Sequence, residues 1–359
     1  MKPTSLAKHP PQGTRPTRAD ALRSLLRSRQ RLLVLTHNNP DPDSLGGAVG
    51  LQEFARKAAG IESRLAITGK ILRAENQAMV RELGILMDRV VDVRLSDYDC
   101  VALVDTQPGF GHTHVPAGLS VDIVLDHHVC PDAERTLRGV AFVDVRSDVG
   151  ATSSMVAGHL MDAGVKPSAE VATALAYGIK TDTADLSRNV TDLDLRAYDF
   201  LFPFVDRKRL VAITNPRLPL AYFQTLKEAL SKVRLYDGLV LCSLGRTPSA
   251  EMVAEVADLL LRYEGAKAVF CGGLVGTNYH VSVRTELGGD AWRLIRAGME
   301  GEDGSCGGHG SVAGGARPPH CPPARPPRAP GRRLRRDIPE ATGLAGTNAA
   351  ALGDGDGDD

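Results

Sequence analysis

The stretch RLLVLTHNNPDPDSLGG, residues 31–47, decides the fold, because it runs from a strand through a polar loop into a helix. After Arg31 its apolar residues do not alternate with polar ones, which is typical of a strand buried on both faces of a parallel sheet. Similar apolar runs recur, with amphipathic stretches between them, up to about residue 205. This alternation predicts βαβ units and hence an α/β domain whose mainly parallel sheet is flanked by helices.

The loop after this strand gathers charged side chains. Two prolines between His37 and Asp43 disfavour helix, so the segment is expected to remain a loop, with Ser44 capping the helix that follows. His37, Asp41 and Asp43 are close together in the sequence, and the two carboxylates repel each other unless a positive charge lies between them. The loop therefore predicts a cation site.

Changes of composition along the chain predict its domains. We expect a disordered lead-in over residues 1–18, a first α/β domain over 19–205, a linker over 206–218, a smaller α/β domain over 219–315 and a disordered tail over 316–359. The tail is rich in proline, arginine and small residues, and a shifted reading frame in a GC-rich gene would write such a sequence too. Its GRRLRR cluster could bind RNA, although a solvated tail is favoured.

The overall composition limits the classes of function. The chain has 359 residues, of which 43% are hydrophobic, enough for two ordinary cores. Lys and Arg total 43, as do Asp and Glu, so no global charge favours a nucleic acid or a membrane as partner. The six cysteines form no CxxC pair and no apolar stretch is long enough to span a membrane, so we expect a cytoplasmic protein with reduced thiols. A homodimer is left open.

Polar side chains stand where the predicted buried strands end. LLVLTH ends in His37, VALVD ends in Asp105, and IVLDHH ends in Asp126, His127 and His128. Because the carboxyl ends of parallel strands form one rim, where ligands bind in doubly wound folds, we expect these residues to converge. Asp182 ends a further apolar helical stretch and can reach the same rim.

Several carboxylates in one cleft require positive charge. Four ionised aspartates carry about four negative charges, which two divalent cations would neutralise. The predicted ligands are His37, Asp41, Asp43, Asp105, His127 and Asp182. Carboxylates and imidazoles without thiolates favour Mn²⁺, and Mg²⁺ or Zn²⁺ less well. Two such ions about 4 Å apart activate water and hold a phosphate oxygen in phosphoester hydrolysis.

Each motif also has a simpler interpretation. An Asp-Pro-Asp loop is most often a capped turn and a lone DHH occurs by chance, but the same residue types at several strand ends favour the metal site. Gly46, Gly47 and Gly50 resemble a dinucleotide fingerprint, yet they lie within the helical stretch and lack the tight-turn glycine. His112 and His114 could extend the metal site, although an exposed pair in a loop is favoured.

These motifs resemble those of the DHH–DHHA1 phosphoesterase superfamily, in its branch of short-oligonucleotide and dinucleotide hydrolases. THNNPDPDSLG is similar to the first motif of the family, VALVDTQPG to the second, VLDHHV to the third and GIKTDT to the fourth. HVSVRT and the later GGHGSVAGG resemble the substrate-binding end of the DHHA1 domain. The resemblance covers about residues 30–315.

The resemblance implies a role for each matching residue. His37, Asp41 and Asp105 would hold one metal ion, and Asp43, Asp105, His127 and Asp182 the other. Asp126 would orient ligands, and His128 would touch the scissile phosphate. The implied contacts of the second domain with a substrate phosphate or terminal nucleotide are Arg284, Gly307, Gly308 and His309. On their own, these glycines would indicate a flexible loop. Family members continue from this motif into a short closing strand and helix, whereas here the proline and arginine tail follows.

The sequence thus predicts an Mn²⁺-dependent phosphodiesterase that hydrolyses short oligoribonucleotides or linear dinucleotides to mononucleotides. It could also remove the 3′-phosphate of 3′-phosphoadenosine 5′-phosphate. Two alternatives stay open. A manganese inorganic pyrophosphatase would share the metal core, and the altered C-terminus is compatible with a nucleotide-binding or RNA-binding protein of weakened catalysis.

Overall fold

The computed structural model describes residues 16–110, 113–130, 132–286, 288–299, 304–317 and 350–351. The chain divides into two compact units, Met1–Pro216 and Arg217–Asp359. Most of the expected lead-in and tail, together with His112, lies outside the described residues. Within the described residues, no helix has the length and apolar character needed to cross a membrane.

The first unit contains a six-stranded parallel sheet with the strand order β3-β2-β1-β4-β5-β6. Its strands are β1 (Arg31–Leu35), β2 (Glu62–Ile67), β3 (Asp88–Arg89), β4 (Cys100–Val104), β5 (Ile123–Asp126) and β6 (Phe142–Val145). Its α-helices are α1 (Arg18–Arg27), α2 (Pro42–Phe54), α3 (Ala74–Leu83), α4 (Ala133–Thr136), α5 (Thr152–Asp162), α6 (Ala169–Asp182), α7 (Asp192–Leu201) and α8 (Arg207–Thr214). Short 3₁₀ or π turns cover Ala55–Ala59, Val90–Asp92, Leu95–Asp97 and Phe202–Phe204. The predicted parallel α/β fold is confirmed.

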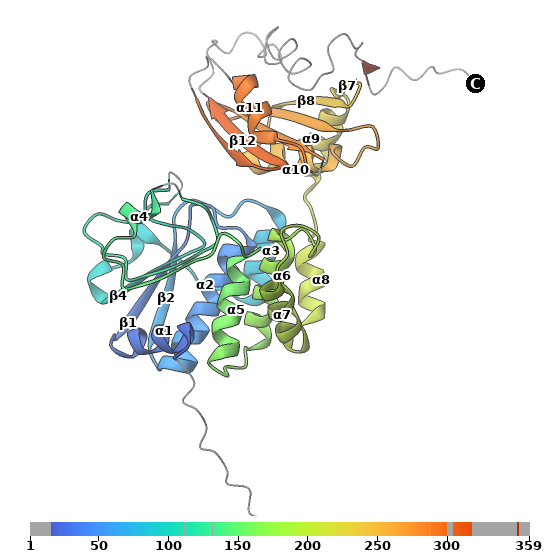
Figure 1. Cartoon of the computed structure of the whole chain (residues 1–359). Helices are drawn as coiled ribbons and strands as arrows, with labels where there is room; N and C mark the ends of the chain where they lie inside the picture. The colour runs from blue at the N-terminus through green and yellow to red at the C-terminus, as the bar shows by residue number, and fades with distance from the viewer. Residues whose placement is uncertain are drawn as a thin grey trace, which may run out of the picture. The chain divides into compact units, whose positions relative to one another are not determined.

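The two faces of this sheet enter different cores, which explains why its strands are apolar without alternation. Leu32 and Val34 of β1 point into the larger core, which is closed by helices that include α2, α5 and α6. These helices pack against one another along the sheet (Figure 1). Leu33 and Leu35 point the other way, into a core completed by residues of loops and 3₁₀ turns. Both faces are therefore buried, as a parallel sheet requires.

Helix α2 begins earlier than predicted. Its N-cap is Asp41, whose side chain accepts a hydrogen bond from the Ser44 backbone N–H at 3.0 Å, so the prediction of Ser44 as the cap is wrong. Pro42 occupies the first turn, where proline is tolerated because the first N–H groups of a helix have no intrahelical partner. Asp43 consequently lies in the first turn of α2, and the expected loop ends before it.

The glycines of α2 let this helix pack closely on its neighbours. A Cβ atom at Gly46 would lie 2.8 Å from the Ala174 carbonyl oxygen of α6. At Gly50 it would lie 2.7 Å from the Val156 Cγ1 of α5. Helix packing therefore accounts for these glycines without a dinucleotide.

The second unit contains a mixed seven-stranded sheet with the order β11-β12-β10-β9-β8-β7-β13. Only β8 and β9 pair in parallel among the neighbouring strands of its described residues. The strands are β7 (Arg234–Tyr236), β8 (Leu239–Arg246), β9 (Ala268–Val275), β10 (Asn278–Thr285), β11 (Ser305–His309), β12 (Val312–Arg317) and β13 (Ala350–Ala351). The helices α9 (Leu220–Leu230) and α10 (Ala250–Leu260) contribute to one core, and α11 (Ala291–Met299) contributes to another. This is the expected smaller α/β unit.

Two segments differ from their predicted character. The expected linker, residues 206–218, contains helix α8, and its Ile213 is fully buried in the core of the first unit. The glycine-rich segment forms the hairpin of β11 and β12 and is not a flexible loop. Gly308 has a φ of 151°, and a Cβ atom there would lie 2.5 Å from the Ala313 Cα. Only glycine allows this close approach of the two strands.

Candidate metal centre

The predicted ligands of the first unit gather at the carboxyl edge of the sheet. His37 follows β1, Asp105 follows β4, and His127 follows β5. β1 and β4 are neighbours, and the chain leaves β1 towards β2 but leaves β4 in the opposite direction, towards β5. Such a switch point opens a crevice for ligands. Asp105 adopts a positive φ of 61°, and its N–H donates to the Leu125 carbonyl oxygen at 2.8 Å. This unfavourable conformation turns the carboxylate at the strand end and is typical of functional sites.

Two further carboxylates reach this edge from helix ends. Asp43 lies in the first turn of α2, and Asp182 is the last residue of α6. The Asp43 carboxylate accepts hydrogen bonds from the backbone N–H groups of Thr152 and Ser153 at 2.7 and 2.8 Å. These donors begin α5, so the positive end of that helix holds a fully buried carboxylate in place.

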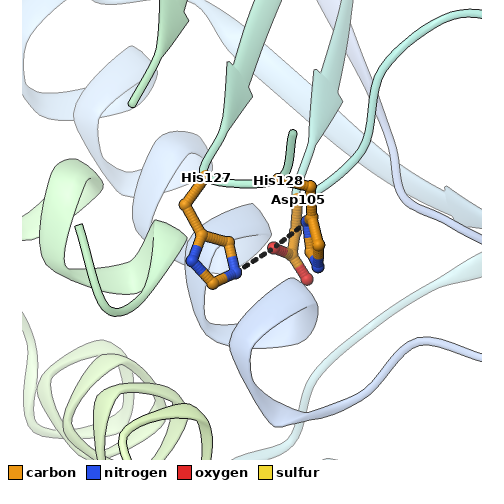
Figure 2. A group of neighbouring side chains, drawn as sticks. All are labelled: Asp105, His127 and His128. Carbon is orange, nitrogen blue, oxygen red and sulfur yellow. Dashed lines mark ion pairs between the residues drawn. The ribbon is translucent and has the colours of Figure 1, made fainter. Parts of the chain in front are cut away.

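The side chains converge closely enough to share metal ions. Figure 2 shows His127 and His128 beside Asp105, with both imidazoles paired to its carboxylate. Ligand atoms within 4.8 Å of one another occur in the groups His37–Asp41–Asp105, Asp43–His127–Asp182 and Asp105–His127–His128. The first group is one of the sets that the family resemblance implies, and the second group is the other implied set without Asp105. Asp105 lies near both groups, because its two carboxylate oxygens are 3.6 Å from His37 Nε2 and 3.7 Å from His127 Nε2.

Two histidines direct the same ring nitrogen at Asp105. His37 Nε2 lies 3.6 Å from Asp105 Oδ2, and its Nδ1 contacts the Asn38 carbonyl oxygen at 2.9 Å. His127 Nε2 lies 3.7 Å from Asp105 Oδ1, and its Nδ1 contacts the Val149 carbonyl oxygen at 3.1 Å. A backbone carbonyl accepts a hydrogen bond from Nδ1–H, so in each neutral ring Nε2 carries the lone pair that a metal ion requires.

His127 Nε2 is also a buried polar atom that forms no hydrogen bond with the described residues. It lies 3.2 Å from Asp182 Oδ2 and 3.9 Å from Asp43 Oδ2. Together with the 3.7 Å approach to Asp105 Oδ1, none of these contacts forms a hydrogen bond within the described residues. Buried polar atoms are almost always satisfied, so an unsatisfied one among carboxylates fits a metal position.

The carboxylates perturb one another strongly. Burial raises the pKa of Asp43 well above its usual value, and the charges of Asp105 and Asp182 act in the same direction. Burial acts on Asp105 in the same way, but hydrogen bonding with His37 and the neighbouring histidine charges outweigh it and lower the pKa. Burial opposes the charged form of His127, yet the adjacent Asp182, Asp43 and Asp105 raise its pKa to about 11. The cluster therefore demands positive charge, which protons or metal cations can supply.

Asp126 belongs to none of these groups and instead holds the DHH segment, residues 126–128, in place. It is fully buried, and its Oδ1 accepts hydrogen bonds from the His127 backbone N–H at 2.9 Å and from His128 Nδ1 at 2.8 Å. Its Oδ2 accepts a hydrogen bond from Gln107 Nε2 at 2.7 Å. The side chain of His128 is 36% exposed, so its ring borders the rim.

Sequence reasoning missed two sets of supporting groups. Gln107 follows Asp105 closely in VALVDTQPG, so its place beside the motif was the available signal. Thr152, whose Oγ1 donates to Asp105 Oδ1 at 2.8 Å, and Ser153 lie in a different segment that shows only a helical pattern. Their contacts to Asp43 use backbone N–H groups, which every residue except proline has, so no residue type signals them.

The residues predicted to bind substrate in the second unit are Arg284, Gly307, Gly308 and His309, and Arg284 already has partners within that unit. Arg284 lies in β10 with its Nε bonded to Asp258 and its Nη1 bonded to the Ser282 hydroxyl at 2.7 Å. It is 9% exposed and therefore already held within its own unit. Gly307 and Gly308 lie in β11, and the side chain of His309 lies outside the described part of the chain.

Comparisons with known proteins show what this chain is similar to. Residues 31–179, which lie within the first unit, match the DHH family, N-terminal domain. The chain is 35% identical over 257 residues to the uncharacterized protein MJ1633 of Methanocaldococcus jannaschii, a match that covers 71% of this chain and 52% of that protein. The chain thus spans about half the length of this curated relative.

A solved structure shares the fold. It is the exopolyphosphatase-related protein from Bacteroides fragilis, which superposes with a TM-score of 0.71 at 15% identity. The superposition covers 90% of this chain and 97% of that protein. At this identity the similarity establishes the fold and leaves the activity to the residues of the site.

Proposed function

We propose that this chain is a metal-dependent phosphodiesterase that hydrolyses short oligoribonucleotides or linear dinucleotides to mononucleotides. One observation carries the proposal. Carboxylates and imidazoles from separate strand and helix ends converge around Asp105, and among the described residues the ion pairs of Asp43, Asp105 and Asp182 run to histidines alone. The DHH-family domain over residues 31–179 supports the same assignment.

The donor set fits two divalent cations. Its atoms are carboxylate oxygens and imidazole nitrogens, a combination that suits Mn²⁺ and, less well, Mg²⁺ or Zn²⁺. The ligands of one ion would be His37, Asp41 and Asp105, and those of the other would be Asp43, Asp105, His127 and Asp182. When bound, such a pair of ions supplies activated water and neutralises charge on the phosphate.

In this proposal the protein residues orient the reacting groups. Asp126 fixes the Nδ1 side of His128 at 2.8 Å, which leaves Nε2 of that ring to face the substrate. His128 would contact the scissile phosphate and give a proton from Nε2 to the leaving oxygen. Asp105 would align both cation positions, because each of its oxygens lies within 4 Å of a different ligand histidine.

The second unit would select the nucleotide. Within the described residues the hydrogen bonds of Arg284 use Nε and Nη1, which leaves Nη2 to contact a phosphate. Gly307 is exposed in β11 and would present its backbone to a terminal phosphate, together with Gly308 and His309. These contacts would favour a substrate with more than one phosphate-linked group.

The proposal is tested by product analysis. Metal-stripped protein is incubated with and without Mn²⁺ against pApA, a short RNA ladder, 3′-phosphoadenosine 5′-phosphate, cyclic di-AMP and pyrophosphate, and the products are separated by liquid chromatography and mass spectrometry. We expect mononucleotides from pApA and short RNA only when Mn²⁺ is present. Phosphate from pyrophosphate alone would identify a pyrophosphatase instead.

A matched pair of variants makes the result specific to the site. Asp105→Ala removes the ligand shared by both ions and is expected to abolish turnover. Asp192→Asn changes an exposed carboxylate in the first turn of α7 and is expected to keep it. Bound metal without any product from the unaltered protein would refute the phosphodiesterase and favour a nucleotide-binding protein.

A further inference from the structure

Gln107 is a buried polar side chain that the proposed mechanism does not use. It follows β4 and is 0% exposed. Its Nε2 donates one hydrogen bond to Asp126 Oδ2 at 2.7 Å and another to the His128 backbone carbonyl oxygen at 2.8 Å. One amide group therefore reaches both the carboxylate that holds the His128 ring and the peptide that carries that ring.

The contacts of Asp126 explain why this amide matters. Its Oδ1 already accepts from His128 Nδ1 and from the His127 backbone, so Gln107 supplies the bond to the other oxygen. A carboxylate bonded through both oxygens cannot rotate about its Cβ–Cγ bond without breaking a hydrogen bond. The imidazole that depends on Oδ1 is fixed in consequence.

Stability alone is a poor explanation for this residue. The Oε1 of Gln107 is buried and has no hydrogen-bond partner among the described residues. An unpaired buried carbonyl oxygen disfavours folding, and an apolar side chain of the same length would avoid it. The two hydrogen bonds donated by Nε2 offset the unfavourable burial of Oε1, and both are made to residues 126–128.

We infer that Gln107 is a positioning residue for His128, acting through Asp126 and through the His128 backbone. This inference rests on the proposed function for its effect on catalysis, and on the hydrogen-bond geometry alone for its effect on the ring. It assigns Gln107 no contact with substrate or metal.

A double-mutant cycle tests the catalytic part. Gln107→Met keeps the chain length and removes the donors together with the unpaired oxygen. We expect it to lower kcat on pApA about 10- to 100-fold, the range typical of lost outer-shell contacts, with KM and Mn²⁺ affinity nearly unchanged. In a His128→Ala background the same substitution should cause no further loss. An equal loss in both backgrounds would indicate a general structural role and overturn the inference.

A spectroscopic readout tests the geometry without activity. In metal-free protein the Nδ1–H proton of His128, assigned by its loss in His128→Ala, should give a slowly exchanging NMR signal that Gln107→Met broadens or removes. Persistence of this signal in Gln107→Met, or its absence from the unaltered protein, would overturn the inference. Loss of the signal in a protein that hydrolyses none of the phosphoesters would refute the proposed function and leave the positioning role intact.

A matched control separates positioning from stability. Thr173 is a fully buried residue of α6 whose hydroxyl bonds the Ala169 carbonyl oxygen and the Asp206 N–H. Thr173→Val is expected to lower the melting temperature while leaving kcat and the His128 signal unchanged. If it reproduced the effects of Gln107→Met, destabilisation would explain both variants and the inference would fail.

Discussion

Two buried clusters of aspartate and histidine occur among the described residues of the first unit, and they differ in what neutralises the carboxylates. In β6, Asp144 accepts hydrogen bonds from Arg146 Nε and Nη2 at 2.7 and 2.8 Å and lies 2.9 Å from His159 Nε2. Arg18 adds a contact at 3.2 Å. At the carboxyl edge of the sheet, Asp43 and Asp105 form ion pairs with histidines, and the negative charge of Asp105 disfavours the charged form of Asp43. Among the described residues, neither of these carboxylates forms an ion pair with an arginine.

The difference shows in the protonation of the two clusters. Burial opposes the charged form of Asp144, but its bonds with His159 and Arg146 outweigh this effect and lower the pKa. Burial also opposes the charged form of Asp43, and there the neighbouring aspartates reinforce it and raise the pKa. One cluster is electrostatically complete and stabilises the fold, whereas the other requires added cations.

The largest expected effect separates the clusters by activity. Asp105→Asn should lower kcat on pApA with saturating Mn²⁺ by about 10³-fold or more, because a ligand common to both cation positions loses its charge. Calorimetry should show weakened Mn²⁺ binding in the same variant. Asp144→Asn, measured per folded molecule, should keep kcat within about threefold, since its contacts lie outside the metal cluster. Equal losses in both variants would erase the distinction.

The second largest expected effect is a loss of stability when the Asp144 cluster is disrupted. Asp144→Ala leaves the buried His159 and the half-buried Arg146 without their partner. Removal of one partner from a buried pair such as Asp144 and His159 typically costs about 3–5 kcal/mol in the free energy of unfolding. Urea unfolding of metal-free protein measures this loss. Asp192→Ala, which removes an exposed carboxylate in α7, serves as the control and should cost less than about 1 kcal/mol. A similar loss in both variants would contradict a stabilising role for Asp144.

The sequence predicted the edge cluster better than the Asp144 cluster, for a physical reason. His37, Asp105 and His127 follow apolar runs, and parallel strands bring their carboxyl ends to one rim whatever the details of packing. Asp144 also lies in an apolar run, but its partner His159 comes from a helix. The spacing of apolar residues in the sequence predicts that a helix forms there. It does not predict which side chain of that helix packs against which strand.

Local structure was harder to predict where two outcomes are chemically equivalent. Asp41 and Ser44 are both good N-cap residues, and Pro42 is compatible with a loop and with a first helical turn. The structure selects Asp41, which places Asp43 within reach of the backbone of α5. In the second unit, glycines that suggest a loop form strand β11, because Gly308 packs against Ala313 at a distance only glycine allows.

A smaller effect concerns metal and stability together. A ligand that binds only the native state raises the free energy of unfolding by about 2.7 kcal/mol at 100 times its Kd. We expect Mn²⁺ at that concentration to produce this rise in the unaltered protein and in Asp144→Asn, but not in Asp105→Asn. Urea unfolding with and without Mn²⁺ provides the measurement. A rise of equal size in Asp105→Asn would place the cation elsewhere than at the edge cluster.

The smallest effect is the pH dependence of the Asp144 cluster. Its carboxyl group has a lower pKa in the native state than in the unfolded chain, where about 3.9 is usual. Its contribution to stability is therefore complete above about pH 4 and is lost as the pH falls towards the native pKa, by at most about 1.4 kcal/mol per pH unit. The difference in unfolding free energy between the unaltered protein and Asp144→Asn should stay constant from about pH 7 to 5 and shrink below about pH 4. Other carboxylates titrate in both proteins and cancel in this difference, so a difference that stayed constant down to pH 3 would show that Arg146 and His159 do not hold the Asp144 charge.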